Sequence, residues 1–545
     1  MAAYKSFKDP IYGYIEIDNH IITTVIDTPE FQRLRNIIQT SYSPLYSSAV
    51  HNRFVHSLGV YHLGKFLSQN IQKKLPDSLY KAIKQEEAAR YFEIFELACL
   101  LHDVGHAPFS HTGEDFYLKD GDRKELHKEI IKLTGDQDLK KEISEKAGIY
   151  KASAHELMSV IVGLRVYDSL FRSDEEKSFF SRCITGYLYA IKTDEKHSFL
   201  NCLVSFLNSS VIDVDKLDYL IRDAYITGFD TINIDYERLL TSINVKKIKN
   251  KYEVIFMKGA ISVIENVVYA HDAERKWIQN HPIVQYEGYL LRNIIGALNR
   301  KYSGKRLFSY SALTRQGIAL SKNYSACLLC DADIIFLLKN LKGNEEVTEL
   351  FDRNSRRHPI WKSESEYKAL FDTCFNDQTY DVLDAEMDDL FKYLNYLNSA
   401  QTINDGTLKA CEEDILSYEK IFHAGGTDSS LEEQITRKYR FKEWIMAFKQ
   451  FAEQQEIEFD FVILKQDQFN SGFAKAKFSE LKIKFHELEN VCRFENVTNV
   501  LTAKKSLREK FFYVFYRRNQ NNEKDLDVFK LINALNELAK QKTMK

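Results

Sequence analysis

The chain has 545 residues, with 75 basic and 78 acidic side chains and a formal net charge of −3. This length allows more than one domain, and the near-neutral balance gives no general attraction to nucleic acid or to an anionic membrane. Eight cysteines exclude a disulfide-stapled fold, and the low counts of proline (7) and glycine (21) are typical of a mostly helical protein. We expect a soluble cytoplasmic protein without a membrane partner, because no apolar run reaches roughly eighteen residues and the first residues lack a secretory core.

The expected elements begin with a short β-hairpin over residues 9–24, where alternating residues are separated by turn residues. Asp27 is the expected N-cap of the next helix, because a proline and an acid follow it closely. Amphipathic helices are expected from there to about residue 300, including an apolar run from near Phe92 to His102. Residues 243–257 predict a second small hairpin with a solvated basic turn.

Three parts are predicted: a helical core, a polar helical extension and a C-terminal α+β subdomain, at residues 1–300, 301–424 and 425–545. A Gly- and Ser-rich breaker separates the last two. Residues 459–464 and 511–516 predict strands of the subdomain, which carries no catalytic pattern and is assigned to oligomer contacts or regulation. Cys327 and Cys330 have the spacing of half a zinc site, but without a second pair we interpret them as buried residues of an apolar helix.

Two histidines and two aspartates, far apart in the chain, form the ligand set of a predicted metal site: His56, His102, Asp103 and Asp215. Mixed nitrogen and oxygen ligands suit a divalent metal that activates water, and Mn, Mg, Fe, Co, Ni and Zn all fit. A His-Asp pair alone is usually structural, satisfied by the backbone at a helix end. The density of histidines argues for a site here, because eight of the fifteen fall between residues 51 and 155.

Four motifs, in this order, resemble those of the HD-domain deoxynucleoside triphosphate (dNTP) triphosphohydrolases. They are residues 27–35 (Asp-Thr-Pro-Glu-Phe-Gln-Arg-Leu-Arg), 51–60 (His-Asn-Arg-Phe-Val-His-Ser-Leu-Gly-Val), 102–111 (His-Asp-Val-Gly-His-Ala-Pro-Phe-Ser-His) and 213–219 (Asp-Val-Asp-Lys-Leu-Asp-Tyr). The family includes bacterial dGTPase-like enzymes and the animal enzyme that joins a sterile-alpha-motif domain to an HD domain. The resemblance covers roughly residues 4–300. It implies a mostly α HD-domain core and an enzyme that hydrolyses dNTPs to deoxynucleoside and tripolyphosphate.

The resemblance also implies which residues act on the substrate. His111 is the acid that protonates the departing 5′-oxygen, His106 and His155 lie beside the scissile phosphate, and Glu114 orients His111. His155 follows His111 at a longer interval than in the animal enzyme, so the alternative for it is a solvated helix residue. The implied substrate-binding residues are Gln39, Arg53, Lys216, Tyr219, Asp223, Arg275 and His281.

Among these, Arg53 and Lys216 are expected at the phosphates, where a guanidinium fork and a point charge suit a triphosphate. Gln39, Tyr219 and Asp223 are expected at the sugar, and a tyrosine close to the 2′ carbon would reject ribose. The alternative for Tyr219 is ordinary helix packing. Arg275 is expected to replace an arginine that the family has one helical turn earlier.

Lys5, Asp27 and Arg35 coincide with positions that bind an activating guanine nucleotide at a subunit interface of the animal enzyme. The resemblance therefore implies an allosteric homo-oligomer. The alternative is that Asp27 only caps its helix and that Arg35 pairs with an acid such as Glu30.

Two other readings of the whole chain stay open. One is another HD phosphohydrolase, either a 5′-nucleotidase or a cyclic-nucleotide phosphodiesterase. The other is a nucleotide sensor or nucleic-acid-binding protein with a vestigial site, in which the basic and aromatic run at residues 437–442 would bind single strands.

Overall fold

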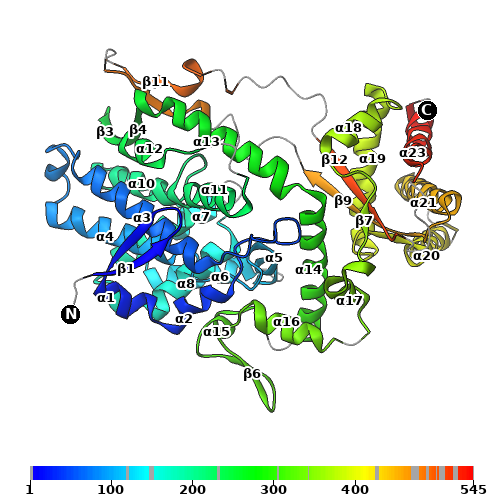
Figure 1. Cartoon of the computed structure of the whole chain (residues 1–545), viewed down its shortest axis with the longest axis horizontal. Coiled ribbons are helices and arrows are strands. Elements are labelled where there is room, and N and C mark those ends of the chain that lie inside the picture. The colour runs from blue at the N-terminus through cyan, green and yellow to red at the C-terminus, as the bar shows by residue number, and fades with distance from the viewer. Residues whose placement is uncertain are drawn as a thin grey trace. The chain divides into compact units, whose positions relative to one another are not determined.

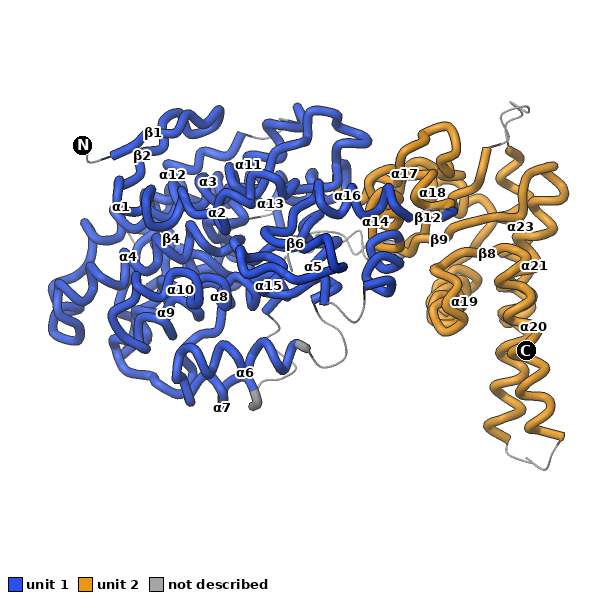
Figure 2. The backbone as a smooth tube through the Cα atoms, turned by 90° about the horizontal axis from the view of Figure 1, so that it is seen from below, with its two compact units in different colours: residues 1–278, 294–343, 471–504 blue, residues 279–293, 344–470, 505–545 orange. Residues whose placement is uncertain are grey.

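The structure is a computed structural model that describes residues 4–117, 122–145, 152–229, 233–302, 306–341, 343–423, 429–467, 478–486, 490–498, 500–501, 510–518 and 526–543. The chain forms two compact units (Figure 2). Unit 1 comprises residues 1–278, 294–343 and 471–504, and unit 2 comprises residues 279–293, 344–470 and 505–545. The domain boundaries expected near residues 300 and 424 stay predictions, and residue 424 lies outside the described residues.

Unit 1 is mostly helical (Figure 1). Its helices are α1 (Asn19–Ile21), α2 (Pro29–Gln32), α3 (Arg53–Gln72), α4 (Gln85–Leu101), α5 (His111–Glu114), α6 (Asp122–Thr134), α7 (Gln137–Glu145), α8 (Ala154–Val166), α9 (Asp174–Thr185), α10 (Glu195–Leu207), α11 (Val214–Thr227), α12 (Tyr236–Thr241), α13 (Ile261–Glu274), the last part of α14 (Pro282–Lys301), α15 (Tyr310–Leu313) and α16 (Asp331–Lys339). Its strands are β1 (Tyr4–Asp9), β2 (Gly13–Asp18), β3 (Ile243–Ile248), β4 (Lys251–Met257), β5 (Ile318–Ser321), β6 (Tyr324–Ala326), β10 (Lys482–Lys484) and β11 (Cys492–Arg493).

The core of unit 1 is built around α4, which packs against α3, α9 and α10. Its apolar residues from Phe92 to Leu101 are buried on nearly all sides, which is typical of a helix in the middle of a domain. α4 ends at Leu101 with His102 as its C-cap, as the sequence predicts. α3 begins after Asn52, whose side chain accepts the N–H of Val55 at 3.2 Å. The start of α3 and the end of α4 lie close together, because Nε2 of His56 is 3.2 Å from Nε2 of His102.

The small sheets of unit 1 are hairpins and their additions. β1 and β2 pair antiparallel, so the first hairpin lies earlier than the predicted 9–24. β3 and β4 form the hairpin predicted at 243–257, and β10 extends it in parallel. The prediction that Asp27 is an N-cap is wrong. Asp27 ends a π-helical turn by donating its N–H to Ile22, and Thr28 occupies the N-cap position of α2.

The prediction that Cys327 and Cys330 are buried in an apolar helix is also wrong. Cys327 is exposed, and Leu328 adopts a φ of 50°, which interrupts any helix. Cys330 instead occupies the N-cap position of α16. No helix among the described residues is long and apolar enough to cross a membrane.

Unit 2 has an α+β organisation. Its elements are the first part of α14, α17 (Glu345–Phe351), β7 (His358–Pro359), α18 (Glu364–Asp372), α19 (Asp377–Tyr396), β8 (Thr402–Asn404), α20 (Asp405–His423), α21 (Ser429–Gln455), β9 (Asp460–Asp467), β12 (Lys510–Tyr516) and α23 (Val528–Thr543). The strand order is β7-β12-β9-β8, and β9 and β12 are the two strands that the sequence predicts. The predicted fold class, a mostly α protein with hairpins and an α+β C-terminal region, is confirmed.

The basic run at residues 437–442 lies in α21, where its cations are ion-paired within unit 2. The pairs are Arg437–Asp389, Lys438–Asp414, Arg440–Glu386 and Lys442–Glu412. The run is therefore part of the packing between helices, and it gives the nucleic-acid reading no support.

Candidate metal centre and active site

Three helix ends bring the four predicted metal ligands into one cluster in unit 1. His56 lies in the first turn of α3, His102 caps α4, and Asp215 lies in the first turn of α11. Nε2 of His56 lies 3.0 Å from Asp215 Oδ1, 3.2 Å from Nε2 of His102 and 3.6 Å from Asp103 Oδ2. Ligands bound at about 2.0–2.2 Å to one ion lie roughly 3–3.5 Å apart, so these spacings fit one metal.

The second nitrogen of each imidazole is held by an acceptor of the protein. Nδ1 of His56 donates to Asp218 Oδ2 at 2.7 Å, and Nδ1 of His102 donates to the carbonyl oxygen of Cys99 at 2.9 Å. Each bond fixes the tautomer in which the lone pair of Nε2 faces the cluster. That tautomer is the one a metal ligand needs.

Asp218 is itself held by a buried ion-pair network. Arg222 donates to both of its carboxylate oxygens at 2.9 Å and to Asp9 at 2.9 Å. The approach of α11 to α3 depends on Gly59, because a Cβ there would lie 1.8 Å from Asp218 Oδ1. The glycine of the second motif thus makes room for the carboxylate that orients His56.

The carboxylates of the cluster are ionised at neutral pH. Burial opposes charge on Asp103, but the guanidinium of Arg53 and the imidazoles of His102 and His56 hold its pKa below the usual range. Burial also opposes charge on Asp215, but the neighbouring imidazoles of His102 and His56 hold its pKa well below the usual range. Two imidazole nitrogens and two carboxylates fit a divalent first-row metal without selecting one. The assignment of these four as ligands stays a prediction that this geometry supports.

The turn between His102 and α5 packs directly on α8. A Cβ at Gly105 would lie 2.3 Å from the backbone nitrogen of Ser159, and Gly105 donates its N–H to Ser159 Oγ at 2.9 Å. Phe109 and Ser110, which precede His111, have φ values of 58° and 52°. Such left-handed conformations cost about 1–3 kcal/mol each for residues with a Cβ.

Three further histidines lie beside the cluster, with ring nitrogens within 4.8 Å of one another: His106, His111 and His155. Glu114 joins two of them, because it accepts from Nδ1 of His111 at 2.7 Å and from Nδ1 of His155 at 2.6 Å. The ring of His155 stacks on that of His106, with 4.1 Å between centroids. The structure thus gathers all four predicted catalytic residues, including His155, whose place the sequence left open.

The charges of these histidines differ. Burial lowers the pKa of His155, but the carboxylate of Glu114 outweighs it and raises the pKa to about 9. Burial and the nearby charge of Arg53 lower the pKa of His106 well below its ordinary value. At neutral pH, a charged His155 therefore lies on a neutral His106.

Arg53 connects the two groups of side chains. Its Nη1 donates to Asp103 Oδ2 at 2.7 Å, its Nε donates to Ser110 Oγ at 3.0 Å, and its Nη2 lies 3.5 Å from Nε2 of His111. Lys216, the other expected phosphate contact, donates to Asp213 at 2.5 Å and to the carbonyl oxygen of Ser209 at 2.8 Å. Two of the three N–H donors of Lys216 are thus engaged within the protein.

The expected sugar contacts lie near a set of buried polar atoms. Tyr219 and Asp223 follow Asp215 along α11, and Asp223 Oδ1 lies 2.8 Å from Nε2 of His51. Gln39 donates its backbone N–H to the carbonyl oxygen of His51 at 2.9 Å. Several buried atoms here have no hydrogen-bond partner among the described residues: Gln39 Oε1, Thr40 Oγ1 and His51 Nδ1. Unpaired buried polar atoms are rare in proteins, so this group is typical of a ligand site.

The remaining predicted contacts are placed less closely. Arg275 begins a π-helical turn after α13. Burial and, as the next largest cause, the charge of Arg275 lower the pKa of His271 to about 3. His281 belongs to unit 2, so its predicted role at the substrate stays a prediction.

The three residues of the expected activator site are exposed side chains of unit 1: Lys5, Asp27 and Arg35. The guanidinium of Arg35 lies 3.5 Å from the ring centre of Phe54, and its Nε donates to Gln32 at 2.8 Å. Arg315, not Arg35, pairs with Glu30, at 3.0 Å.

Sequence reasoning missed the residues that support the centre: Asp218, Arg222, His51, Arg33 and Asp331. Asp218 had a usable signal, because it stands at i+3 from Asp215 in the same motif. Arg222 follows Asp218 at i+4, and Arg33 and His51 stand in the first and second motifs, whereas Asp331 comes from a distant segment that only the fold brings here.

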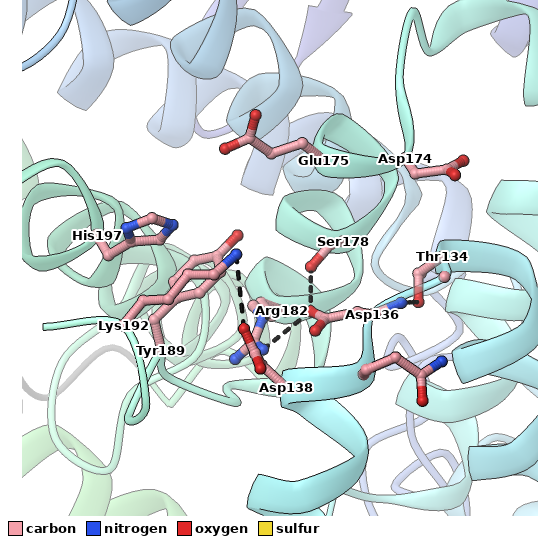
Figure 3. Close-up of a pocket in the computed structure, with 12 residues that line it drawn as sticks. Thr134, Asp136, Asp138, Asp174, Glu175, Ser178, Arg182, Tyr189, Lys192 and His197 are labelled. Atoms are coloured by element: carbon pink, nitrogen blue, oxygen red, sulfur yellow. Dashed lines mark hydrogen bonds and ion pairs between the residues drawn. The ribbon is translucent and has the colours of Figure 1, made fainter.

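A pocket of about 450 Å³ lies elsewhere in unit 1, between the start of α7, the start of α9 and the loop before α10 (Figure 3). Its buried cation, Arg182, is bonded to Asp136 at 2.9 Å and to Glu142 at 2.8 Å. Lys192 pairs with Asp138 at 3.6 Å. These charges are paired within the protein, so they join helices and do not offer a phosphate site.

Comparison with known proteins agrees with this geometry. Residues 53–159 match the family model of the HD domain, which includes His56, His102 and Asp103. The chain is 30% identical over 263 residues to the uncharacterized protein MG461 of Mycoplasma genitalium, covering 48% of this chain and 52% of that protein. It is 32% identical over 253 residues to the deoxynucleoside triphosphate triphosphohydrolase SAMHD1 of Xenopus laevis, covering 46% and 38%. The resemblance seen in the motifs is confirmed.

The fold as a whole has a solved counterpart. A hypothetical protein from Aquifex aeolicus matches 98% of this chain and 99% of its own with a TM-score of 0.53 and 18% sequence identity, which shows the fold alone. The chain spans about half the length, or less, of the curated relatives it matches. HD domains are metal-dependent, and the cluster of His56, His102 and Asp103 is a group that can hold a metal ion.

Proposed function

We propose that this chain, which carries an HD domain over residues 53–159, is a metal-dependent phosphohydrolase that cleaves dNTPs to deoxynucleoside and tripolyphosphate. The observation that carries the proposal is that one arginine, Arg53, joins the metal cluster to His111. The site that would bind the metal ion therefore lies next to the residue that would donate the proton. The name of the frog relative, a dNTP triphosphohydrolase, supports the choice of substrate.

The residues around the cluster provide for the charge of a triphosphate. When bound at His56, His102, Asp103 and Asp215, a divalent metal supplies Lewis acidity for attack of water on phosphorus. Arg53 and charged His155 add positive charge on the side of the histidines, and Lys216 adds it from α11. Together they neutralise the roughly four negative charges of the substrate.

The leaving group of this reaction is the 5′-oxygen of the nucleoside, which needs a proton as it departs. His111 is the proposed donor, because its side chain is exposed and its Nδ1 is fixed by Glu114, so that Nε2 is directed away from the carboxylate. Tyr219 and Asp223 are proposed at the sugar, where the tyrosine excludes a 2′-hydroxyl. A homo-oligomer with an activating nucleotide at Lys5, Asp27 and Arg35 completes the proposal.

The products decide between this function and its alternatives. Purified protein is incubated with Mn²⁺ or Mg²⁺ and with each dNTP and NTP, and the products are separated by anion-exchange chromatography. Tripolyphosphate and deoxynucleoside are expected from dNTPs only. Orthophosphate or pyrophosphate as the product would contradict the proposal and favour the other HD phosphohydrolases. The control is the double variant His102→Ala/Asp103→Ala, which should bind no metal and turn over no substrate while remaining folded.

A further inference from the structure

Asp331 connects two segments of the HD centre from a distant part of the chain. It is the first residue of α16, and its Oδ1 accepts the backbone N–H of Phe109, 222 residues earlier, at 2.7 Å. Its Oδ2 accepts the backbone N–H of Ile38 at 2.8 Å. Burial raises the pKa of Asp331 to about 6, so the carboxylate is charged at pH 7 and both oxygens can accept.

The two segments are those on which the active site depends. Phe109 and Ser110 hold their left-handed conformations immediately before His111, and Ile38 precedes Gln39. Ser110 Oγ also donates to the carbonyl oxygen of Ile38, so the segments meet beside Asp331.

The imidazole of His111 is only partly packed, because it meets the rings of His106 and His155 edge-on, with 5.2 and 5.3 Å between centroids. Its side chain is 65% exposed, and α5, which begins with it, is a single turn. Its place is therefore set by the backbone of the preceding turn and by Glu114. Strained conformations of this kind persist only where the surroundings hold them.

Arg33 makes a second connection between the same parts. It donates to the carbonyl oxygens of Val104 at 3.0 Å and His106 at 2.8 Å, and also to that of Leu329 at 2.8 Å, two residues before Asp331. The start of α16 is thus joined to the HD turn at two points, and Asp331 is the one nearer to His111.

We propose that Asp331 is a positioning residue of the HD centre, whose carboxylate holds the strained turn that places His111 for proton transfer. The role of His111 rests on the proposed function, but the hold on the turn does not. The variant Asp331→Asn tests both parts, because it keeps the size of the side chain while one backbone N–H loses its acceptor.

The matched control is Asp333→Asn. Asp333 lies two residues further along the same helix, and its carboxylate accepts the N–H of Cys330 at 2.9 Å within the cap of α16. Asp331→Asn should lower kcat for dNTPs roughly ten- to a hundredfold, the usual result of misplacing a reacting group, with metal content unchanged. Asp333→Asn should stay within about twofold of the parent, since it only weakens the cap of α16. Equal losses in both variants would overturn the proposal in favour of a structural role for α16.

Two further measurements separate positioning from general destabilisation. In a His111→Ala background, Asp331→Asn should change kcat by less than about twofold, because a residue that acts through His111 has nothing left to position. An additive loss would overturn the proposal. Hydrogen exchange should accelerate in Asp331→Asn at one or both of the amides of Ile38 and Phe109, and at neither in Asp333→Asn. Asp331→Ser serves if the asparagine variant does not fold.

The exchange measurement needs no turnover. If the wild-type protein hydrolyses no dNTP, the proposed function fails, while faster exchange at Phe109 still establishes the hold of Asp331 on the turn. If dNTPs are hydrolysed but exchange at both amides is unchanged in the Asp331 variants, the positioning role is wrong and the proposed function stands.

Discussion

Asp218 and His56 form a buried hydrogen bond, 2.7 Å from Oδ2 to Nδ1, on the side of the imidazole that faces away from the metal cluster. The bond sets the tautomer of His56. Arg222 in turn holds Asp218 by donating two hydrogen bonds of 2.9 Å to its carboxylate. The suitability of Nε2 of His56 as the proposed metal ligand therefore depends on residues outside the cluster.

Asp218→Asn should weaken metal binding about ten- to a hundredfold, because the amide does not stabilise the required tautomer as a carboxylate does. Isothermal titration calorimetry of the metal-free protein with Mn²⁺ or Co²⁺ measures the change in metal affinity. Asp9→Asn, which alters the same network one step further from His56, is the control and should weaken binding less. Unchanged affinity in Asp218→Asn would show that His56 is not a ligand.

His111→Ala should leave the metal content near that of the parent and slow dNTP turnover by roughly a hundredfold or more, the usual contribution of a positioned acid. Metal analysis and initial rates measure the two effects. His127→Ala is a suitable control, since His127 lies outside the cluster and contacts the hydroxyl of Tyr187 at 2.9 Å. Loss of metal in His111→Ala would make this histidine a ligand, and the acid would then be sought at His106 or His155.

The proposed ligands were easier to find in the sequence than the residues that hold them in place. They stand in short motifs at helix ends, where capping and apolar runs can be recognised: His102 follows an apolar helix, and Asp215 lies in the first turn of another. Asp331 and Arg33 had no such signal, because each makes its bonds to backbone atoms that only the fold brings near. The helical character followed from periodicity and the HD-domain core from the resemblance, whereas the N-cap assigned to Asp27 failed because a π-helical turn shifted the helix start by one residue.

Glu114→Gln should flatten the pH dependence of stability between about pH 6.5 and 9. The pKa of His155 is about 9 in the folded protein, above the ordinary 6.5, because Glu114 outweighs the effect of burial. A raised histidine pKa stabilises the protein fully below pH 6.5, and this contribution is lost as the pH rises through 9. Without the carboxylate, roughly 1–3 kcal/mol of pH-dependent stability should disappear.

Urea unfolding at pH 6, 7.5 and 9.5 measures this difference in the free energy of unfolding. Glu114 is charged in both folded and unfolded states across that range, so the slope reports on the histidine. The other charged neighbours of His155, which are Glu156 and Asp103, are the same in the parent and in Glu114→Gln. Equal slopes for parent and Glu114→Gln would show that Glu114 does not hold the proton of His155.

Asp27→Ala and Arg35→Ala should each abolish stimulation of dNTP hydrolysis by a second nucleotide, while metal content and fold stay unchanged. The structure removes two competing explanations for these side chains, because Thr28 occupies the N-cap position and Glu30 pairs with Arg315. Both are exposed on unit 1, where a carboxylate and a guanidinium can bind a guanine edge through paired hydrogen bonds. Such coupling implies sigmoidal kinetics and an oligomer that assembles with nucleotide.

Initial rates with pairs of nucleotides, together with light scattering, measure both effects, and Lys8→Ala on β1 is the control for a change of exposed charge. Hyperbolic kinetics with every pair of nucleotides, in a protein whose oligomeric state ignores them, would contradict activation at this surface.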